Sequence, residues 1–327
     1  INTLYYLKYN KEIDLYDLEN NTRQFYNSKF YHTEDLNSVI PLMKQIEFLE
    51  NISTSINLDY SLENEDYNEI SDALFNIENV GLYKESDLVY TQYNPFTATG
   101  RPSNRFGGVN YAALNKEDET RKAYTSRFGT GGKLVEFDYD AYHLRLIGEV
   151  VNYKFPDGSV HEHMSKFYGC DYQESKRRSF QYLYGHIPIE VVQMNPFFGK
   201  VQDFIDELWK SYKKDKYIDT NIYSRRIFSQ NVSDMNKNKL FNYFIQSLET
   251  ETNMKMLSTL FNTIKDYKSK LVLYNYDSFL FDFNIEDGVN YLKLLKNEIE
   301  LSGKFPTSIS WGLNYHEMED ITEKFVG

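Results

Sequence analysis

Residues Lys176–Gly185 read KRRSFQYLYG, and this segment has the spacing of a ligand-binding helix. Lys176, Phe180 and Tyr184 are four residues apart, so on an α-helix they lie on one face. A cation, a flat apolar ring and a hydroxylated ring in line suit a nucleoside triphosphate, with the charge on the phosphates and a ring stacked on the base. The same spacing fits an ordinary helix with buried aromatic rings and solvated cations, so other segments have to distinguish the two interpretations.

Two strand-like segments, one on each side of this helix in the sequence, carry an aspartate. Lys133–Tyr139 (KLVEFDY) predicts a strand that ends near Asp138, and Leu271–Phe283 (LVLYNYDSFLFDF) predicts a hairpin with Asp277 at its turn. A two-metal phosphoryl-transfer site needs such carboxylates, because they bridge two divalent ions about 3.5–4 Å apart. Mg²⁺ prefers oxygen ligands. Taken alone, both aspartates also fit solvated turn acids.

The composition describes a soluble globular protein. The 327 residues are 41% hydrophobic and 26% charged, and this length predicts two or three subdomains. No apolar run approaches the roughly 20 residues of a membrane span, and no signal-peptide pattern is visible, so we expect no membrane partner. The single cysteine, Cys170, excludes an internal disulfide framework and suits a reducing compartment. The chain begins at Ile1, which suggests that upstream sequence is missing.

The net charge of −12 is concentrated in the N-terminal part of the chain. Residues 1–90 hold 17 acidic against 6 basic residues, so the remainder is nearly neutral. Two local stretches are basic, which permits contact with nucleic acid. Their basic residues are Arg101, Arg105 and Lys116 in the first stretch, and Arg225, Arg226, Lys237 and Lys239 in the second.

Hydrophobic periodicity and turn residues predict the other elements. These are a helix after Pro41, a helix over Tyr67–Val80, loops from about Val89 to Lys133, a mostly helical stretch from Ala141 to about Lys268, and a helix over Asp287–Leu301 with Asp287 as its cap and Gly303 as its stop.

Six segments, taken together and in this order, resemble the motifs of the A-family DNA polymerases. Phe137–Arg145 resembles the family's first catalytic motif, Lys176–Gly185 has the K-x(3)-F-x(3)-YG spacing of its nucleotide-binding helix, and Tyr276-Asp277 resembles its third motif. The accessory segments are the T-x-TGR-x-S-type loop Thr97–Asn104, the N-x(3)-Q pair of Asn242 and Gln246, and the closing strand Ile309–Tyr315. The match runs from about Val89 to Glu319.

The resemblance implies roles for individual residues. Asp138 and Asp277 would bind two Mg²⁺ ions, for which Mn²⁺ can substitute, and the Tyr139 carbonyl would be a further ligand. Lys176 would neutralise the triphosphate, Phe180 would pack on the incoming base and sugar, and Tyr184 would close the pocket behind the templating position. His161 resembles the family's phosphate-contacting histidine, with a surface histidine at a helix start as the alternative.

The resemblance also implies contacts with primer-template DNA. Arg101, Asn242 and Gln246 would donate to the minor-groove edge, where acceptors common to all base pairs allow pair geometry to be checked without selecting sequence. Arg225 and Arg226 are further candidates for DNA contact. Arg145 would support the site from behind, or is an ordinary helix cation.

Four positions depart from the family pattern. His143 replaces the glutamate that usually excludes a ribose 2′-hydroxyl, and Tyr172 replaces an arginine that contacts the triphosphate. Tyr276 replaces the histidine before Asp277, and Ser278 replaces the acid after it. His143 could still hydrogen-bond Tyr184 and block the sugar edge, so the preference for dNTPs is weakened as an inference and is not refuted.

The implied fold is an α+β right hand. We expect an antiparallel β-sheet palm over 90–150 and 262–327, helical fingers over 151–261, and a reduced helical thumb over 1–89 whose acidity suits a DNA grip poorly. No 3′–5′ exonuclease domain fits in this length, so proofreading would lie in missing N-terminal sequence or a separate protein, and other replisome proteins are possible partners. The Asn/Tyr/Lys bias hints at a phage or other virus, and hence at the host cytoplasm.

Two other functions fit part of the pattern. Single-subunit RNA polymerases share the palm, the lysine and the tyrosine-glycine, lack the sugar-gating glutamate and have aspartate-serine in the third motif. The Thr97–Asn104 loop, the Asn242/Gln246 pair and the short chain oppose that interpretation. A non-catalytic DNA-binding relative of a polymerase would be expected to lose Asp138, Asp277 or Lys176, and all three are present.

Overall fold

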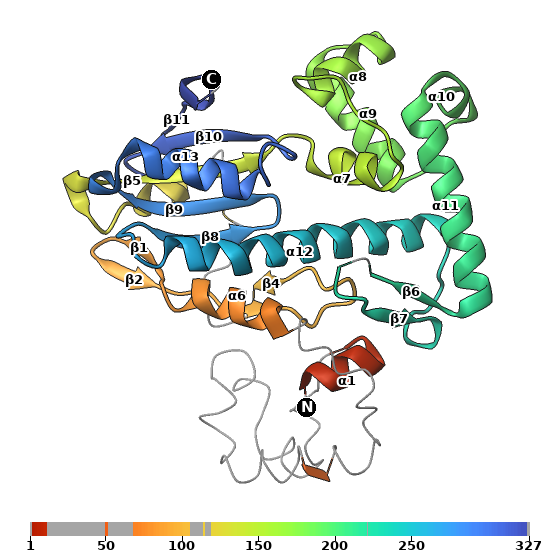
Figure 1. Ribbon diagram of the computed structural model, residues 1–327, viewed down its shortest axis with the longest axis horizontal. Helices are drawn as coiled ribbons and strands as arrows, with labels where there is room; N and C mark the ends of the chain where they lie inside the picture. The colour runs from red at the N-terminus through yellow and green to blue at the C-terminus, as the bar shows by residue number, and fades with distance from the viewer. Residues whose placement is uncertain are drawn as a thin grey trace.

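The computed structural model describes residues 2–11, 50–51, 68–104, 114, 119–220 and 222–325. Figure 1 shows the sheet on the left and a helical lobe, α7 to α11, on the right. One long helix, α12, runs beneath the sheet and reaches the lobe. The helix predicted after Pro41 lies outside the described residues. None of the helices in the described ranges is long and apolar enough to cross a membrane.

The central sheet has five antiparallel strands in the order β11-β10-β5-β9-β8. Its strands are β5 (Gly132–Tyr139), β8 (Lys270–Asn275), β9 (Ser278–Asn284), β10 (Thr307–Gly312) and β11 (Met318–Asp320). β5 is the middle strand and pairs with β9 on one side and β10 on the other. The predicted KLVEFDY strand and the predicted hairpin are both confirmed, with Tyr276 and Asp277 forming the turn between β8 and β9.

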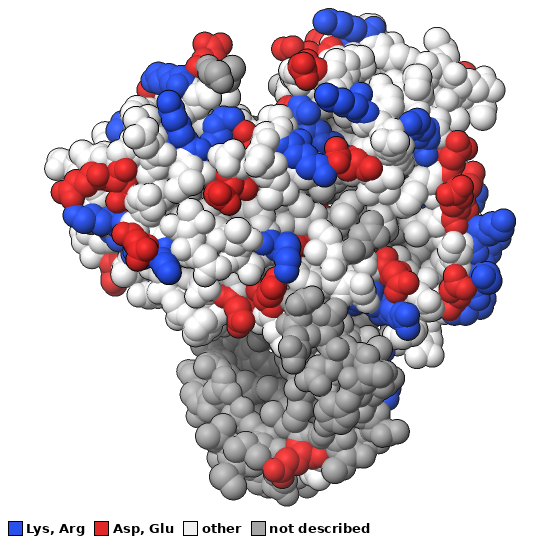
Figure 2. All heavy atoms as spheres, in the orientation of Figure 1, with Lys and Arg blue, Asp and Glu red and all other residues white. Residues whose placement is uncertain are grey.

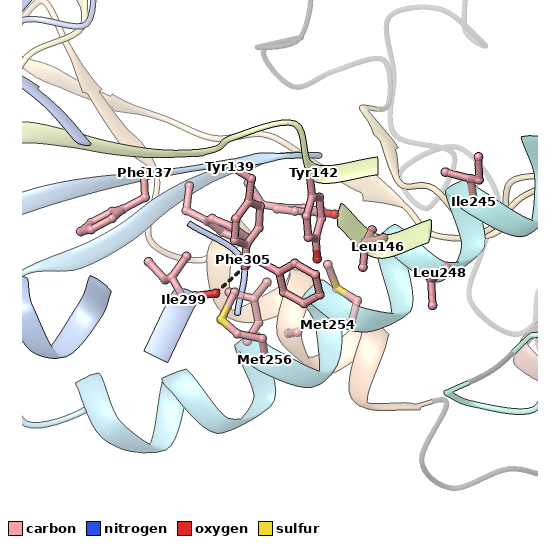
Figure 3. Packing of buried hydrophobic residues seen from close by; sticks show 14 of the residues in the cluster. Phe137, Tyr139, Tyr142, Leu146, Ile245, Leu248, Met254, Met256, Ile299 and Phe305 are labelled. Carbon is pink, nitrogen blue, oxygen red and sulfur yellow. Dashed lines mark hydrogen bonds between the residues drawn. The ribbon is translucent and has the colours of Figure 1, made fainter. Parts of the chain in front are cut away.

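Aromatic side chains fill the core beside the end of β5 (Figure 3). The rings of Tyr139 and Tyr142 stack with their centroids 4.0 Å apart, and Phe305 packs edge-on against Tyr142 at 5.3 Å. The Tyr139 hydroxyl donates a 2.6 Å hydrogen bond to the carbonyl of Ile299. Because Tyr139 and Tyr142 are almost completely buried, the chain that leaves β5 after Asp138 is held firmly by packing.

Three helices cover or flank the sheet: α6 (Asn68–Glu78), α12 (Lys237–Ile264) and α13 (Gly288–Ile299). α6 confirms the helix predicted over Tyr67–Val80, and its buried face packs on α12 and β8. α12 contacts α6, α7 and α13 as well as α9 and α11. Its residues also cross the predicted boundary between the fingers, which end at 261, and the palm, which resumes at 262.

The helical lobe consists of α7 (Tyr142–Val150), α8 (Val160–Tyr168), α9 (Tyr172–Tyr184), α10 (Ile189–Met194) and α11 (Pro196–Asp215). Side chains cap three of these helices: Ser159 accepts from the Glu162 amide, Asp171 from the Glu174 amide, and Asn195 from the first turn of α11. Capping oxygens satisfy amides that have no partner within the helix. The cap at Asp171 therefore fixes where α9, and with it Lys176, begins.

Several short elements were not predicted. The stretch read as helical contains the hairpin of β6 (Tyr217–Asp219) and β7 (Arg226–Phe228). The N-terminal third contains α1 (Asn2–Tyr9) and the strands β1 (Leu82–Lys84), β2 (Asp87–Val89), β3 (Tyr93–Asn94) and β4 (Ser103–Asn104). The 3₁₀ turns are Glu119–Ala123, Gly129–Gly131, Ser229–Asn231, Ile285–Asp287 and Thr322–Phe325. The thumb over 1–89 stays a prediction.

Asp287 holds the predicted N-cap position of α13 but does not cap the helix with its side chain. Asp287 precedes α13, but its side chain makes no hydrogen bond to that helix. Instead its carboxylate accepts hydrogen bonds from the amide of Ser269 at 2.7 Å and from the Ser269 hydroxyl at 2.6 Å. Asp287 therefore ties the start of α13 to the chain entering β8. The hydrogen bonds from Ser269 and Lys268 hold the pKa of Asp287 below its usual value although burial acts in the opposite direction.

A buried ion pair joins β9 to the segment before β5. Asp282 is completely buried, and its carboxylate accepts from the Ser126 hydroxyl at 2.6 Å, the Arg127 amide at 3.0 Å and Arg127 Nε at 2.7 Å. The Arg127 guanidinium also donates to the carbonyls of Val80 and Gly81. The entry to β5 is close-packed here, since a Cβ at Gly132 would lie 2.0 Å from the Ser126 Oγ.

Candidate active site

The sheet brings Asp138 and Asp277 together at one of its ends. Asp138 pairs in register with Ser278, the residue after Asp277, and the Tyr139 amide donates a 3.0 Å hydrogen bond to the Asp277 carbonyl. Both segments contain a non-glycine residue in the left-handed region, Ala141 at φ 49° and Tyr276 at φ 61°. Such residues are uncommon and gather at functional sites, because surrounding structure has to hold them.

The two carboxylates suit hard divalent cations. Asp138 is half-buried and Asp277 is open to solvent on one side. The protein around Asp277 removes part of its hydration, and this desolvation, with the negative charge of Glu249, raises the pKa of Asp277 above its usual value. Among the described residues Asp277 has no basic partner within 4.0 Å, whereas a divalent cation would offset both unfavourable effects.

Oxygen donors of this kind fit Mg²⁺. Within the described ranges, three or more His, Cys, Asp or Glu residues do not gather into a metal-holding group. Two aspartates and the Tyr139 carbonyl would therefore need oxygens from a nucleotide or water to complete the coordination. The Tyr139 side chain takes no part, because it is buried in the core.

A pocket of about 460 Å³ opens next to the aspartates. Its residues come from seven separate segments of the chain. They are Arg101, then Asp138 to His143 at the end of β5 and the start of α7, His161 on α8, Tyr172, Lys176, Phe180 and Tyr184 on α9, Glu249 on α12, and Asp277 with Ser308 on the sheet.

The predicted face of α9 lines this pocket. Lys176 is exposed and has no acidic partner within 4.0 Å among the described residues, while Phe180 is 37% exposed. The rings of Phe180 and Tyr184 are almost parallel, 8° apart, with their centroids separated by 6.0 Å. Burial, with the negative charge of Glu249, raises the pKa of Tyr184, so its hydroxyl keeps its proton. The amphiphilic face is thus open to a ligand and is not core.

His161 is a buried residue of the pocket, which rules out the alternative of a surface histidine. It is 2% exposed, its ring meets Tyr172 edge-on at 5.7 Å, and its Nδ1 has no hydrogen-bond partner among the residues that the structure describes. Desolvation lowers the pKa of His161, and the cations Lys176 and Arg145 lower it further. A buried ring nitrogen without a partner, beside a pocket, is suited to an anionic ligand.

His143 contacts both Tyr184 and Glu249, and all three residues line the pocket. The predicted hydrogen bond between His143 and Tyr184 is confirmed, and it joins Nδ1 to the hydroxyl oxygen. On the other side of the ring, Nε2 lies 3.0 Å from Oε1 of Glu249. Glu249 was missed by the sequence analysis, although its place three residues after Gln246 puts it on a neighbouring part of the same helix face.

The residues predicted to contact DNA lie in different surroundings. Arg101 lines the pocket, with its Nε 2.9 Å from Glu249 and its guanidinium 3.8 Å from the centre of the Tyr276 ring. Asn242 donates a 3.3 Å hydrogen bond to the Tyr184 carbonyl, and Gln246 accepts one of 3.1 Å from the Thr99 hydroxyl. Asn242 therefore lies beside a residue that lines the pocket, whereas Gln246 contacts the loop that contains Arg101.

Arg225 and Arg226 differ although they are adjacent. Arg226 is exposed on the β6–β7 hairpin, where it pairs with Asp219. Arg225 is only 3% exposed, and its guanidinium donates to Asn10 at 2.7 Å and to Ser247 at 3.3 Å. In this conformation Arg225 joins Asn10, the residue after α1, to α12 and is not available to DNA, which corrects its predicted role.

Arg145 connects the site to the loop before α8. Its guanidinium donates to the Asp140 carboxylate at 2.7 Å, to the Asp140 carbonyl at 3.0 Å and to the Gly158 carbonyl at 2.9 Å. Figure 2 shows a notch between the sheet and the lobe that carries α8, with Lys and Arg side chains on both sides of it. Arg145 and Asp140 also line a second cavity, of about 750 Å³, in this region.

In this arrangement an antiparallel sheet carries two aspartates at one end, and a helical lobe faces them with a lysine and two aromatic rings. Among solved structures, the chain is similar to the POL domain of Pol1 from M. smegmatis in complex with DNA primer-template and dNTP, with a TM-score of 0.59 and 18% identity. The similarity covers 96% of this chain and 63% of that one. No protein-family model matches the sequence, and no curated protein matches it.

Proposed function

We propose that the chain is the polymerase core of a DNA-directed DNA polymerase of the A family. It would add dNTPs to a primer 3′ end as directed by a template and release pyrophosphate. The observation that carries this proposal is the pocket in which Lys176 and Phe180 share one space with Asp138 and Asp277. The similar solved domain contains DNA primer-template and dNTP, which supports the same ligands here.

The reaction would take place at the end of the sheet. Asp138, Asp277 and the Tyr139 carbonyl would hold two Mg²⁺ ions, which when bound activate the attacking hydroxyl and stabilise the leaving oxygen. Lys176 would place its charge against the triphosphate as negative charge builds on pyrophosphate. Nδ1 of His161 has no hydrogen-bond partner in the described part of the chain, and it would add a hydrogen bond to a phosphate oxygen.

The base and the primer end would be held by the rings and amides around the pocket. Phe180 offers a partly exposed ring for packing on the incoming base and sugar, and Tyr184 lies behind it. Arg101, Asn242 and Gln246 would face the minor-groove edge of the primer-template end. Such donors test base-pair geometry and do not select a sequence.

A primer-extension assay with Mg²⁺ tests this proposal. We expect extension with dNTPs, loss of extension when the metal is chelated, and loss in Asp277→Ala with primer-template binding largely retained. Asp219→Ala is the matched control, because Asp219 is an exposed hairpin aspartate outside the pocket. Near-normal extension by Asp277→Ala would refute the metal-binding role of Asp277.

One observation favours a second candidate function. His143 occupies the position of the family's sugar-excluding glutamate, and Ser278 follows Asp277 as in single-subunit RNA polymerases. The same assay with NTPs distinguishes a ribonucleotide-tolerant enzyme from a strict DNA polymerase. Extension with neither sugar would instead support a non-catalytic DNA-binding relative.

A further inference from the structure

Asn253 on α12 contacts both of the segments that carry the candidate metal-binding aspartates. Its side chain is completely buried. Its Oδ1 accepts a 2.6 Å hydrogen bond from the Tyr142 hydroxyl. Its Nδ2 donates to the Tyr276 carbonyl at 2.7 Å and to the Tyr274 hydroxyl at 3.1 Å. A side-chain amide has one acceptor oxygen and two donor hydrogens, so both ends of Asn253 are used.

The Tyr276 carbonyl belongs to a turn that needs support from outside its hairpin. Tyr276 and Asp277 form the two-residue turn between β8 and β9, and Tyr276 has φ 61°. A two-residue turn with positive φ at its first position favours glycine there, because a side chain makes the left-handed region costly. Asn253 binds the carbonyl of this strained residue, and the Arg101 guanidinium lies 3.8 Å from the centre of its ring. These contacts support the backbone directly before Asp277.

The Tyr142 hydroxyl belongs to the segment that leaves β5 after Asp138. Tyr142 is the first residue of α7 and follows Ala141, whose φ is 49°. Its buried ring points toward α12 (Figure 3), and its hydroxyl ends on Asn253. Asn253 therefore joins the two backbone segments in which a non-glycine residue takes the left-handed conformation close to an aspartate.

The sheet itself does not extend to the second aspartate. Pairing between β5 and β9 ends at Asp138 and Ser278. Asp277 lies one residue further, where the Tyr139 amide donates to its carbonyl. A site for two ions about 3.5–4 Å apart tolerates little movement of its carboxylates. The hydrogen bonds of Asn253 add a constraint on the turn beyond the last paired residues of the sheet.

We propose that Asn253 is a positioning residue for the metal site, which sets the separation of the Asp138 and Asp277 carboxylates by tying the turn to the start of α7. Asn253 is not among the residues that line the nucleotide pocket, so it acts through the backbone of Tyr276. This inference rests on the proposed polymerase function. Without the amide, the Tyr276 carbonyl loses its donor and the turn relaxes toward a less strained backbone. Asp277 then moves from its place beside Asp138, and the affinity for divalent cations falls.

Direct binding of Mn²⁺ to the chain tests this role without turnover. Electron paramagnetic resonance of free Mn²⁺ gives the Kd, and the binding that is lost in Asp277→Ala identifies the site. We expect Asn253→Leu to raise this Kd about 10- to 100-fold, the usual effect of losing a group that orients a metal ligand. Primer extension at low Mg²⁺ should fall to a similar degree and recover as the Mg²⁺ concentration is raised, which a general loss of structure would not allow.

Asn195→Leu is the matched control. Asn195 is also a buried asparagine, and its Oδ1 accepts from the amides of Phe197 and Phe198 at the start of α11, outside the pocket. Its replacement removes a helix cap and should lower the stability of the protein. The Kd for Mn²⁺ should stay unchanged, which separates positioning of the aspartates from a loss of stability.

Tyr142→Phe is a milder variant, because it keeps the packed ring and removes only the hydroxyl that binds Asn253. We expect it to raise the Kd for Mn²⁺ about 2- to 10-fold, as for the loss of one hydrogen bond. Adding it to Asn253→Leu should change the Kd by less than about 2-fold, since the two residues act through one contact. An unchanged Kd in Tyr142→Phe, or in folded Asn253→Leu, overturns the inference while the proposed function stands. If no Mn²⁺ binding depends on Asp277, the inference and the metal site of the proposed function are both overturned.

Discussion

Replacing Arg127 with Met should destabilise the protein strongly, because it leaves the buried carboxylate of Asp282 without its cation. Breaking a buried ion pair from one side costs about 3–5 kcal/mol. Asp282 would keep the hydrogen bonds from the Ser126 hydroxyl and the backbone amide of residue 127, which favours the lower part of that range. The lost donors to Val80 and Gly81 add about 1 kcal/mol, so we expect about 4 kcal/mol in total.

Thermal unfolding measures this effect. With an unfolding entropy of about 2.1 cal/mol/K per residue, 4 kcal/mol corresponds to a fall in Tm of about 6 °C for a chain of 327 residues that unfolds in one step. The control is Arg226→Met, which breaks the exposed pair with Asp219 and should cost no more than about 1 kcal/mol.

A double variant identifies the source of the loss. Arg127→Met combined with Asp282→Asn contains no unpaired buried charge at this site. Its loss of unfolding free energy should therefore be smaller than the sum of the two single losses by at least about 1.5 kcal/mol. A cost below about 1 kcal/mol for Arg127→Met, or strict additivity in the double variant, would show that the pair does not hold β9 and the entry to β5 together.

Two further predictions concern the nucleotide. Lys176→Ala should lower kcat/KM for dNTPs about 10- to 100-fold, as expected for one charge-assisted contact, with primer-template affinity unchanged; an equal loss of DNA binding would contradict the phosphate role. His161 has a lowered pKa in the free protein, and phosphate contact would favour its protonated form, so nucleotide binding should take up a proton. KM for the nucleotide should therefore rise with pH over the range between two pKa values of His161. The lower is its pKa in the free protein, which is below 6.5, and the higher is its pKa in the nucleotide complex. A pH-independent KM, or the same dependence in His161→Gln, would count against this role.

The end of the sheet that carries Asp138 and Asp277 could be predicted because local pattern determines it. KLVEFDY and LVLYNYDSFLFDF carry β-forming side chains on either side of their aspartates, and antiparallel pairing then places Asp138 beside the turn that contains Asp277. The spacing of Lys176 and Tyr184 likewise determines a helix face without reference to the rest of the chain.

The environment of α12 could not be predicted in this way. Its segment Ser247–Met254 reads SLETETNM, which by composition suits a solvated helix, yet every residue in it is buried. Burial there comes from packing by α6, α7 and α13, which are distant in sequence. For the same reason Glu249 was not identified, and Arg225 was assigned to DNA when it lies inside the protein.

The length of α12 has a mechanical consequence. At 1.5 Å per residue its 28 residues extend for about 42 Å, and Figure 1 shows α11 at one end of the helix and α13 near the other. A continuous helix resists bending, so α11 cannot shift far from the sheet without breaking it. A movement that brings Lys176 closer to Asp138 and Asp277 would therefore be a rotation of α8 and α9 relative to α12, which stays in place. The residues of α12 beside Tyr184, Asn242 among them, would act as its pivot.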